Sequence, residues 1–203
     1  MAKPAQPTHS AEAATPARRY GGVSMEARQA ERRDRLIMAA IHVSARTGRD
    51  GATVAAICAE AGLTARYFYE SFANREALFL AAFSRVQDEL FARIAPFATG
   101  RDRVKGALTG FFSMLAEHPG PARVFLVELD ETEPAMKELG RAASARFGAL
   151  FAPEAPPESL AQAGVAGAVV QIARRWVRGG FSEKLDDVVA TALPFARAGA
   201  KAG

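Results

Sequence analysis

Residues 53–78 constrain the fold of this chain more than any other stretch, because they carry two short helical segments separated by a glycine turn. Thr53 can cap the first helix, since its hydroxyl can accept a hydrogen bond from a backbone N–H of the first turn. Gly62 stands at the end of this helix, where glycine adopts a left-handed conformation without steric penalty. Leu63 follows, and Thr64 occupies the cap position of the second helix. Two helices joined in this way are typical of helix-turn-helix proteins, in which the second helix enters a DNA groove.

The second helix of the pair has two faces of different character. Phe68 and Phe72 are four residues apart, so they share one face and are predicted to point inward. The outer face carries two tyrosines and an arginine, whose polar tips and flat faces suit phosphate oxygens, thymine methyls and base edges. The predicted base contacts are Arg66 and Tyr67, the predicted phosphate contacts are Thr64, Tyr69, Ser71 and Arg75, and Ala65 completes the predicted interface.

The positive charge of the chain is concentrated in the part that contains this helix pair. The 203 residues carry a formal net charge of +4. Residues 1–75 hold 11 lysines and arginines against 7 acidic residues, whereas residues 76–203 hold 15 of each. A phosphate backbone would therefore be attracted to the N-terminal part and indifferent to the remainder. A surplus of this size is also common on protein surfaces, so the charge supports the helix-turn-helix interpretation without establishing it.

The remaining periodicity is helical, and the sequence predicts an all-α chain. Residues 1–27 are low in large apolar side chains and are expected to form a disordered arm, either a solvated tail or a contact to a neighbouring minor groove. Residues 28–75 are expected to form a DNA-binding domain, and residues 76–198 a helical body. Apolar residues at spacings of three and four, with their capping signals, predict helices over 28–47, 75–94, 102–117, 121–129, 134–151, 160–178 and 181–193.

The residues around the turn resemble the DNA-binding signature of the TetR family of transcriptional regulators. That family typically shows a Gly-hydrophobic-Ser/Thr turn, a tyrosine five residues after the Ser/Thr, a phenylalanine three further on, and then a basic residue followed by a leucine. Ser71 departs from the pattern, because a histidine is common at its position. The resemblance covers residues 32–83, and it is carried by Gly62, Leu63, Thr64, Tyr69, Phe72, Arg75 and Leu78.

The resemblance implies two roles for the C-terminal body. TetR-like regulators usually bind a small effector in a cavity between helices, and the candidate lining residues here are Met114, Phe125 and Trp176. Ordinary core packing would account for the same side chains. Two helices of each subunit form a four-helix dimer interface in that family. Small residues within 161–173 and apolar residues within 185–193 suit such an interface, and packing within a monomer would also explain them.

No pattern in the sequence indicates catalysis, a cofactor or a bound metal. The phosphate loop, the dinucleotide fingerprint and the hydrolase and zinc-protease motifs are absent. The acidic residues of 128–133 lack the regular spacing of a cation site. Cys58 is the single cysteine, which excludes an intrachain disulfide and agrees with a cytoplasmic location. The longest run of small apolar residues is too short to span a bilayer, so no membrane association is expected.

These observations lead to one predicted function and one alternative. We expect a transcriptional regulator, a repressor rather than an enzyme, that binds a palindromic double-stranded DNA operator as a homodimer and is released by a small-molecule effector. In the expected mechanism the effector tilts the long helix over residues 75–94 and changes the spacing of the two DNA-reading helices. The alternative is a helical small-molecule-binding protein with little or no DNA-binding activity.

Overall fold

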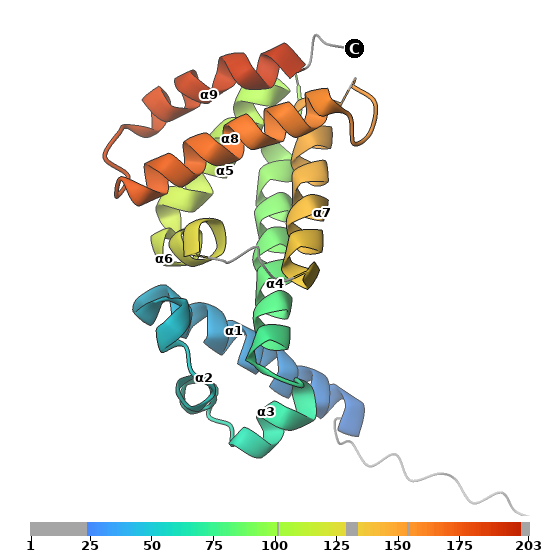
Figure 1. The fold of residues 1–203 in the computed structure, drawn as a ribbon, viewed down its shortest axis with the longest axis vertical. Helices are drawn as coiled ribbons and strands as arrows, with labels where there is room; N and C mark the ends of the chain where they lie inside the picture. Colours follow the sequence, from blue (N-terminus) through green and yellow to red (C-terminus); the bar gives the residue numbers. More distant parts are fainter. Residues whose placement is uncertain (1–23, 101, 129–133, 154, 200–203) are drawn as a thin grey trace, which may run out of the picture.

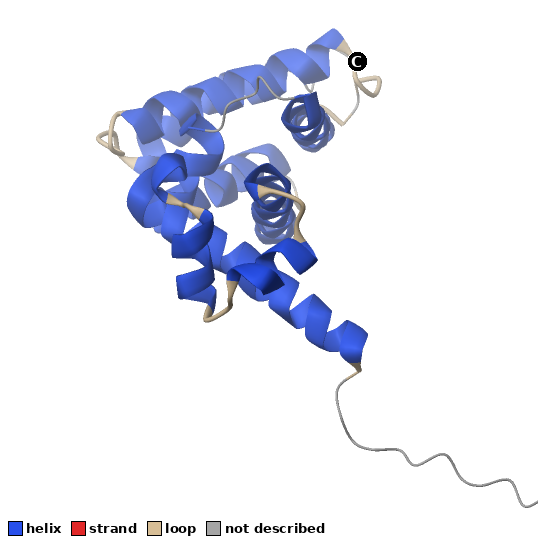
Figure 2. Cartoon of the chain, turned by 60° about the horizontal axis from the view of Figure 1, so that its bottom comes forward, coloured by secondary structure: helices blue, strands red, loops and turns tan. Residues whose placement is uncertain are grey.

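The computed structural model describes residues 24–100, 102–128, 134–153 and 155–199, and every regular element within these ranges is a helix (Figures 1 and 2). This confirms the predicted all-α fold. A stretch apolar enough to cross a bilayer is not found in any helix of the described ranges. The elements are α1 (Met25–Gly51), α2 (Val54–Ala61), α3 (Ala65–Ser71), α4 (Arg75–Ile94), the 3-10 helix η1 (Ala95–Phe97), α5 (Arg103–Glu117), α6 (Pro119–Arg123), the π-helical segment η2 (Val124–Glu128), α7 (Pro134–Phe151), α8 (Leu160–Arg178) and α9 (Leu185–Gly199).

Helices α1, α2 and α3 form a small bundle at one end of the molecule (Figure 1). The bundle is held by a hydrophobic core to which each of its helices contributes a fully buried side chain: Leu36, Ile57 and Phe68. The first turns of α4 complete this core with Leu78 and Phe79. Burial of such side chains is the main source of stability in a domain of this size, at about 1.5–3 kcal/mol each.

Helix α4 connects this bundle to the C-terminal body. Its first half belongs to the N-terminal core, whereas Leu90 and Ile94 near its end belong to a second core shared with α5, α7, α8 and α9. Figure 1 shows α4 running through the middle of the molecule with α7 alongside it. Helices α8 and α9 pack alongside each other at the end opposite to α1–α3, so the predicted DNA reader and the predicted dimerisation helices lie at opposite ends of the protein.

Three predicted helix starts are confirmed by the caps that the structure shows. The side chains of Thr53, Asn74 and Ser159 each accept a hydrogen bond from the backbone N–H three residues later, at 3.2, 2.8 and 3.3 Å. Each bond satisfies one of the N–H groups that the first turn of a helix leaves without a partner. These caps fix where α2, α4 and α8 begin.

The first helix is longer than predicted. It begins at Met25 because the Ser24 hydroxyl accepts a hydrogen bond from Ala27 N at 3.1 Å. Gly48, the residue predicted to end the helix, adopts φ 72° and ψ 173°, and one short turn follows it to Gly51. The predicted stop is therefore a sharp kink, which glycine permits because it has no Cβ.

Two later predictions of helix bounds are wrong. Helix α6 begins at Pro119 rather than Pro121, and it passes directly into the π-helical segment η2. Helix α9 begins at Leu185 rather than at 181–182, because Phe181 adopts φ 59°, a conformation that a right-handed helix excludes. Most of the predicted arm, residues 1–23, and the acidic stretch 129–133 lie outside the described residues.

Candidate functional site

The turn between α2 and α3 has the geometry that the sequence predicts. Gly62 adopts the left-handed conformation, with φ 62° and ψ 38°. Its N–H donates to Ala59 O at 3.2 Å, and the N–H of Leu63 donates to Cys58 O at 2.9 Å. These two bonds satisfy carbonyl groups at the end of α2 and fix the direction in which the chain enters α3.

The two faces of α3 are separated as predicted. Phe68 is fully buried and Phe72 is 4% exposed, and their ring centroids lie 6.1 Å apart. On the other side, Tyr67 is 37% exposed and Tyr69 is 62% exposed. A large aromatic side chain on the surface of a short helix contributes little to folding, so these tyrosines are available to contact a partner.

Arginines of α1 hold α3 from the side, which sequence reasoning did not identify. Arg33 donates from Nη1 to Ser71 O at 2.9 Å, and its guanidinium carbon lies 4.1 Å from the ring centroid of Phe72. The guanidinium of Arg32 lies 4.7 Å from the ring centroid of Tyr67. The cluster of arginines at residues 32–35 was the available signal, but periodicity alone does not show which neighbour each one reaches.

Most of the predicted contact residues share the outer surface of α3. Arg66 is well exposed and its Nε lies 2.9 Å from Glu70 Oε1, so an exchangeable surface ion pair orients it. Thr64 occupies the cap position, yet its side chain makes no capping bond with the helix. Ser71 Oγ donates to Tyr67 O at 2.9 Å. The hydroxyl of Ser71 is therefore committed to its own helix, whereas the Thr64 hydroxyl is not.

Arg75 is less accessible than the sequence suggests. Its Nη1 lies 3.4 Å from Arg49 O, to which it donates, and its Nε lies 3.7 Å from Glu76 Oε1. The guanidinium also lies 5.8 Å from the ring centroid of Phe79, so the side chain covers the base of α4. Arg75 thus links α4 to the end of α1, beside the outer surface of α3.

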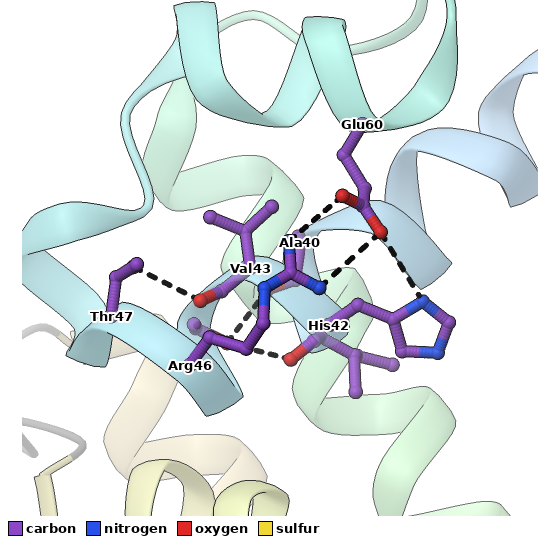
Figure 3. Close-up of polar contacts among 8 residues, drawn as sticks. Ala40, His42, Val43, Arg46, Thr47 and Glu60 are labelled. Carbon is purple, nitrogen blue, oxygen red and sulfur yellow. Dashed lines mark hydrogen bonds and ion pairs between the residues drawn. The ribbon is translucent and has the colours of Figure 1, made fainter.

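A polar network on the surface fastens α2 to α1 (Figure 3). Arg46 donates from Nη2 to Glu60 Oε2 at 2.8 Å, and His42 Nδ1 lies 3.9 Å from Glu60 Oε1. The hydrogen bond from Arg46 lowers the pKa of Glu60 below its usual value, with the charges of Arg46 and His42 acting in the same direction. On the inner side of the same helix, burial raises the pKa of the Cys58 thiol, which makes it a packing residue rather than a nucleophile.

The C-terminal body contains a cavity of about 340 Å³ between α4, η2, α7 and α8. This volume falls within the range of small-molecule sites, roughly 300–1,000 Å³. Its lining combines aromatic and aliphatic side chains with three basic ones. Its lining residues are Phe83, Gln87, Phe125, Leu126, Met136, Lys137, Gly140, Arg141, Ala143, Ser144, Phe147, Ala166, Gly167, Val170 and Arg174.

A second, smaller cavity of about 50 Å³ adjoins the first and reaches between α4, α5 and α6. The two share Gln87, Phe125, Leu126 and Phe147 in their walls. The smaller cavity is apolar apart from Gln87 and His118. Gln87 Oε1 and His118 Nε2 are buried and have no hydrogen-bond partner among the described residues.

The structure brings two of the three predicted ligand-binding residues together. Phe125 lines both cavities and Met114 lines the smaller one. Trp176 lines neither of them. Its indole Nε1 donates to Glu183 O at 3.0 Å, and its ring packs against Phe181 with centroids 4.9 Å apart, so it supports the turn between α8 and α9.

Helices α8 and α9 carry two exposed large apolar side chains. Leu160 is 91% exposed and Phe195 is 52% exposed. Gly164 and Gly167 of α8 are both exposed, and Gly167 also lines the larger cavity. A Cβ atom added at either would meet no atom within 4 Å. Nothing within the described chain therefore requires glycine at these two positions.

Comparisons with known proteins agree with this geometry. Residues 36–82 match the sequence model of the bacterial regulatory proteins of the tetR family. These residues run from α1 to the first half of α4, so they include the complete helix-turn-helix. Comparison with curated protein sequences finds no match.

Solved structures share the fold over most of the chain. FadR from Bacillus subtilis, solved with stearoyl-CoA, is 20% identical, with a TM-score of 0.66 over 82% of this chain and 98% of its own. The multidrug binding protein EbrR, solved with malachite green, is 18% identical, with a TM-score of 0.67 over 81% of this chain and 98% of its own. A tetR-family regulator from Streptomyces coelicolor is 18% identical, with a TM-score of 0.70 over 86% of this chain and 81% of its own.

TetR-family regulators are non-enzymatic DNA-binding proteins, which agrees with the prediction that the chain is not an enzyme. Identities this low show a shared fold, but they do not show that two proteins bind the same ligand. Residues 36–82 thus carry the helix-turn-helix of the tetR family of bacterial regulatory proteins, and the chain shares its fold with solved regulators of that family.

Proposed function

We propose that the chain is a homodimeric repressor that binds a palindromic operator through α3 and leaves it when a small molecule occupies the larger cavity. The observation that carries the DNA part is the outer surface of α3. Two exposed tyrosines and Arg66 face outward there, while Phe68 anchors the helix from within. Base contacts are assigned to Arg66 and Tyr67, and phosphate contacts to Thr64, Tyr69 and Arg75. Ser71 would reach a phosphate only by giving up its hydrogen bond to Tyr67 O. Ala65, at the first position of α3, completes the proposed contact surface.

The surface of α8 and α9 supports the proposal of a homodimer. Exposed Leu160 and Phe195 form apolar surface on the described chain, and Gly164 allows a second helix to approach closely. A two-fold dimer through this surface leaves α3 of each subunit free at the opposite end (Figure 1). In the usual geometry the two α3 helices then enter successive major grooves, about 34–36 Å apart.

The wall of the cavity supports a link between effector binding and the DNA-binding bundle. Phe125 of η2 lines the cavity and packs against Phe83 of α4, with ring centroids 6.4 Å apart. At the start of α6, a Cβ atom on Gly120 would lie only 2.7 Å from the Cβ of Ala45, so α6 rests directly on α1. An effector that displaces Phe125 would move α4 and α1 together, which tilts α3.

The effector must bind the DNA-free conformation more tightly than the DNA-bound one, because otherwise it shifts no equilibrium. FadR and EbrR are each described in complex with a small molecule, and both share the fold of this chain. This similarity supports a small-molecule effector for the present protein without indicating which one.

A duplex-binding titration tests the DNA part of the proposal. Fluorescence anisotropy with labelled duplexes from the region upstream of the gene would be measured between about 50 and 200 mM salt. We expect log K to fall linearly with log salt concentration. Arg75→Gln should reduce the slope by about 1 if Arg75 contacts a phosphate. Absence of salt-dependent binding to any duplex would contradict a regulator and favour a small-molecule-binding protein.

Light scattering coupled to size exclusion tests the dimer. Gly164→Arg should convert the dimer into a folded monomer, because a monomer has open space at this position. Ala149→Arg, at an exposed site of α7, is the matched control and should remain dimeric. A wild-type protein that elutes as a monomer at micromolar concentration would contradict the proposed assembly.

A further inference from the structure

Two polar atoms on the walls of the smaller cavity are buried and unpaired. Gln87 Oε1 and His118 Nε2 have no hydrogen-bond partner among the described residues, and the other described side chains of the lining are apolar. Buried polar atoms in native proteins are almost always hydrogen-bonded, because leaving one without a partner is unfavourable. A packing defect is a poor explanation for two such atoms at one cavity. They indicate a site whose occupant supplies the missing hydrogen bonds.

Gln87 connects this site to the larger cavity. It lies on α4 and belongs to the walls of both cavities, whereas His118, between α5 and α6, belongs to the smaller one. The smaller cavity has a volume of about 50 Å³, which accommodates a small polar group or a water molecule. The larger cavity, of about 340 Å³, has room for the body of a small molecule. A ligand would therefore occupy the larger cavity and extend one polar group past Gln87 toward His118.

The unpaired atom of Gln87 selects the chemistry of this polar group. An amide oxygen only accepts hydrogen bonds, so the group must donate one, and an ionised carboxylate has no proton to donate. An ammonium group donates, but no described residue that lines either cavity is acidic, so its charge would be buried without compensation. A hydroxyl donates to Gln87 Oε1 and can also accept a hydrogen bond from His118 when Nε2 carries the ring proton.

The walls of the larger cavity suit an uncharged, apolar body. The rings of Phe83, Phe125 and Phe147 belong to its lining, and such rings favour apolar and aromatic contacts. The basic side chains of the lining are engaged with other groups or with water. Arg141 is ion-paired with two glutamates, Arg174 donates to a carbonyl of η2, and Lys137 is exposed.

We propose that the effector is an uncharged, apolar molecule that carries a hydroxyl group. Gln87 and His118 bind the hydroxyl in the smaller cavity, and the apolar body lies against Phe125 in the larger one. This proposal rests on the proposed function for the regulatory role of the site. The binding itself does not require DNA, so the two can be tested separately.

Four probes that differ in one substituent distinguish the chemistry of the site: 4-ethylphenol, 4-ethyltoluene, 4-ethylanisole and 4-ethylbenzoate. Calorimetric titration of each into the full-length protein measures its affinity. 4-Ethylphenol should bind at least about fivefold more tightly than 4-ethyltoluene, the effect of a hydroxyl that finds buried partners. The anisole, which cannot donate, and the benzoate, which is charged, should both bind more weakly than the phenol.

Three results of these titrations would overturn the proposal. Equal affinities for the phenol and the toluene would mean that the two polar atoms hold ordered water only. An anisole that binds as tightly as the phenol would exclude donation to Gln87. A benzoate that binds more tightly than the phenol, or a phenol that does not bind, would exclude a neutral hydroxyl as the recognised group.

Variants of the two polar side chains test their role directly. Gln87→Met replaces the acceptor with a side chain of similar length, and His118→Leu removes the ring nitrogens. Each should bring the affinity for 4-ethylphenol close to that for 4-ethyltoluene and leave binding of the toluene unchanged. Gln29→Met, at an exposed site of α1, is the matched control and should change neither. A preference for the phenol that survives in either cavity variant would overturn the proposal.

A further variant tests the location of the apolar body. Gly140→Leu should weaken binding of both 4-ethylphenol and 4-ethyltoluene, because Gly140 lines the larger cavity and a side chain added there meets open space. A thermal melt like that of the wild type shows that the variant folds. Undiminished binding of both probes by Gly140→Leu would overturn the location.

The DNA titration separates failure of this proposal from failure of the proposed function. A protein that binds DNA and is released by 4-ethylbenzoate but not by 4-ethylphenol keeps its function as a regulator and loses the hydroxyl proposal. A protein that binds 4-ethylphenol through Gln87 but binds no DNA keeps the hydroxyl site and loses the regulatory function.

Discussion

Replacing Phe68 with alanine tests whether the inner face of α3 is structural and its outer face functional. Phe68 is fully buried, and its ring lies 5.1 Å from that of Tyr69 and 6.1 Å from that of Phe72, measured between centroids. Truncation of a buried phenylalanine costs about 3–5 kcal/mol, because transfer free energy is lost and a cavity remains. Domains have only about 5–15 kcal/mol of net stability, so this is a large fraction.

Urea denaturation measures the effect. With a slope of about 2 kcal/mol per molar urea, a loss of 3–5 kcal/mol lowers the midpoint by roughly 1.5–2.5 M. Far-UV circular dichroism follows the helices, and hydrogen exchange of α3 amides shows whether the bundle opens locally. A loss of stability below about 1 kcal/mol would refute the inward packing of Phe68.

The neighbouring residue provides the matched control. Tyr69→Ala removes an aromatic side chain that is 62% exposed. It gives up the edge-to-face contact with Phe68, a contribution of about 0.5–1.5 kcal/mol. We expect a small change in the urea midpoint and a clear loss of DNA affinity. If Tyr69→Ala costs as much stability as Phe68→Ala, the assignment of the two faces is wrong.

Four substitutions extend the test to the surroundings of α3. Arg66→Ala should reduce discrimination between operator and random duplex, as measured by competition; an equal loss on all sequences would move Arg66 to the phosphate contacts. Arg32→Ala should weaken DNA binding because the Arg32 guanidinium lies over the Tyr67 ring and holds it in its orientation, and anisotropy that shows unchanged affinity would contradict this. Thr64→Val should weaken binding to all duplexes with little change in the thermal melt, since the hydroxyl makes no capping bond; a lowered melting temperature would show a cap instead. Arg46→Ala should return the pKa of Glu60, followed by NMR titration, toward its usual value, and an unchanged pKa would contradict the hydrogen bond as its cause.

The lowered pKa of Glu60 makes its contribution to the stability of the fold depend on pH. Because the pKa of Glu60 is lowered in the folded protein, the carboxylate stabilises the fold above its ordinary pKa. That contribution is lost as the pH falls through the lowered pKa. In Arg46→Ala this acid-dependent contribution should disappear.

The sequence predicted those features that depend on neighbours in the chain. Thr53, Asn74 and Gly62 act through bonds to residues within five positions, so residue type and spacing are sufficient to recognise them. Phe68 and Phe72 separate from the tyrosines because a helix places residues four apart on one face.

The features that the sequence did not predict depend on contacts between distant segments. Arg33 reaches the carbonyl of Ser71, 38 residues away, and periodicity gives no information on such a pair. Trp176 is an aromatic residue of the kind that lines ligand cavities, yet its indole N–H donates to Glu183 O in the turn after α8. The π-helical turn of η2, which carries Phe125 into the cavity wall, has no recognised sequence signal.

Selection of bound sequences from a random duplex pool tests whether α3 reads the DNA sequence. The purified protein would be used in successive rounds of capture and sequencing, with Arg66→Ala in parallel. We expect a two-fold symmetric consensus with half-sites one helical turn apart, degraded in the variant at the base pairs that Arg66 contacts. A pool that remains random, or a consensus that the variant selects unchanged, would contradict the assignment of α3 as the DNA-reading helix.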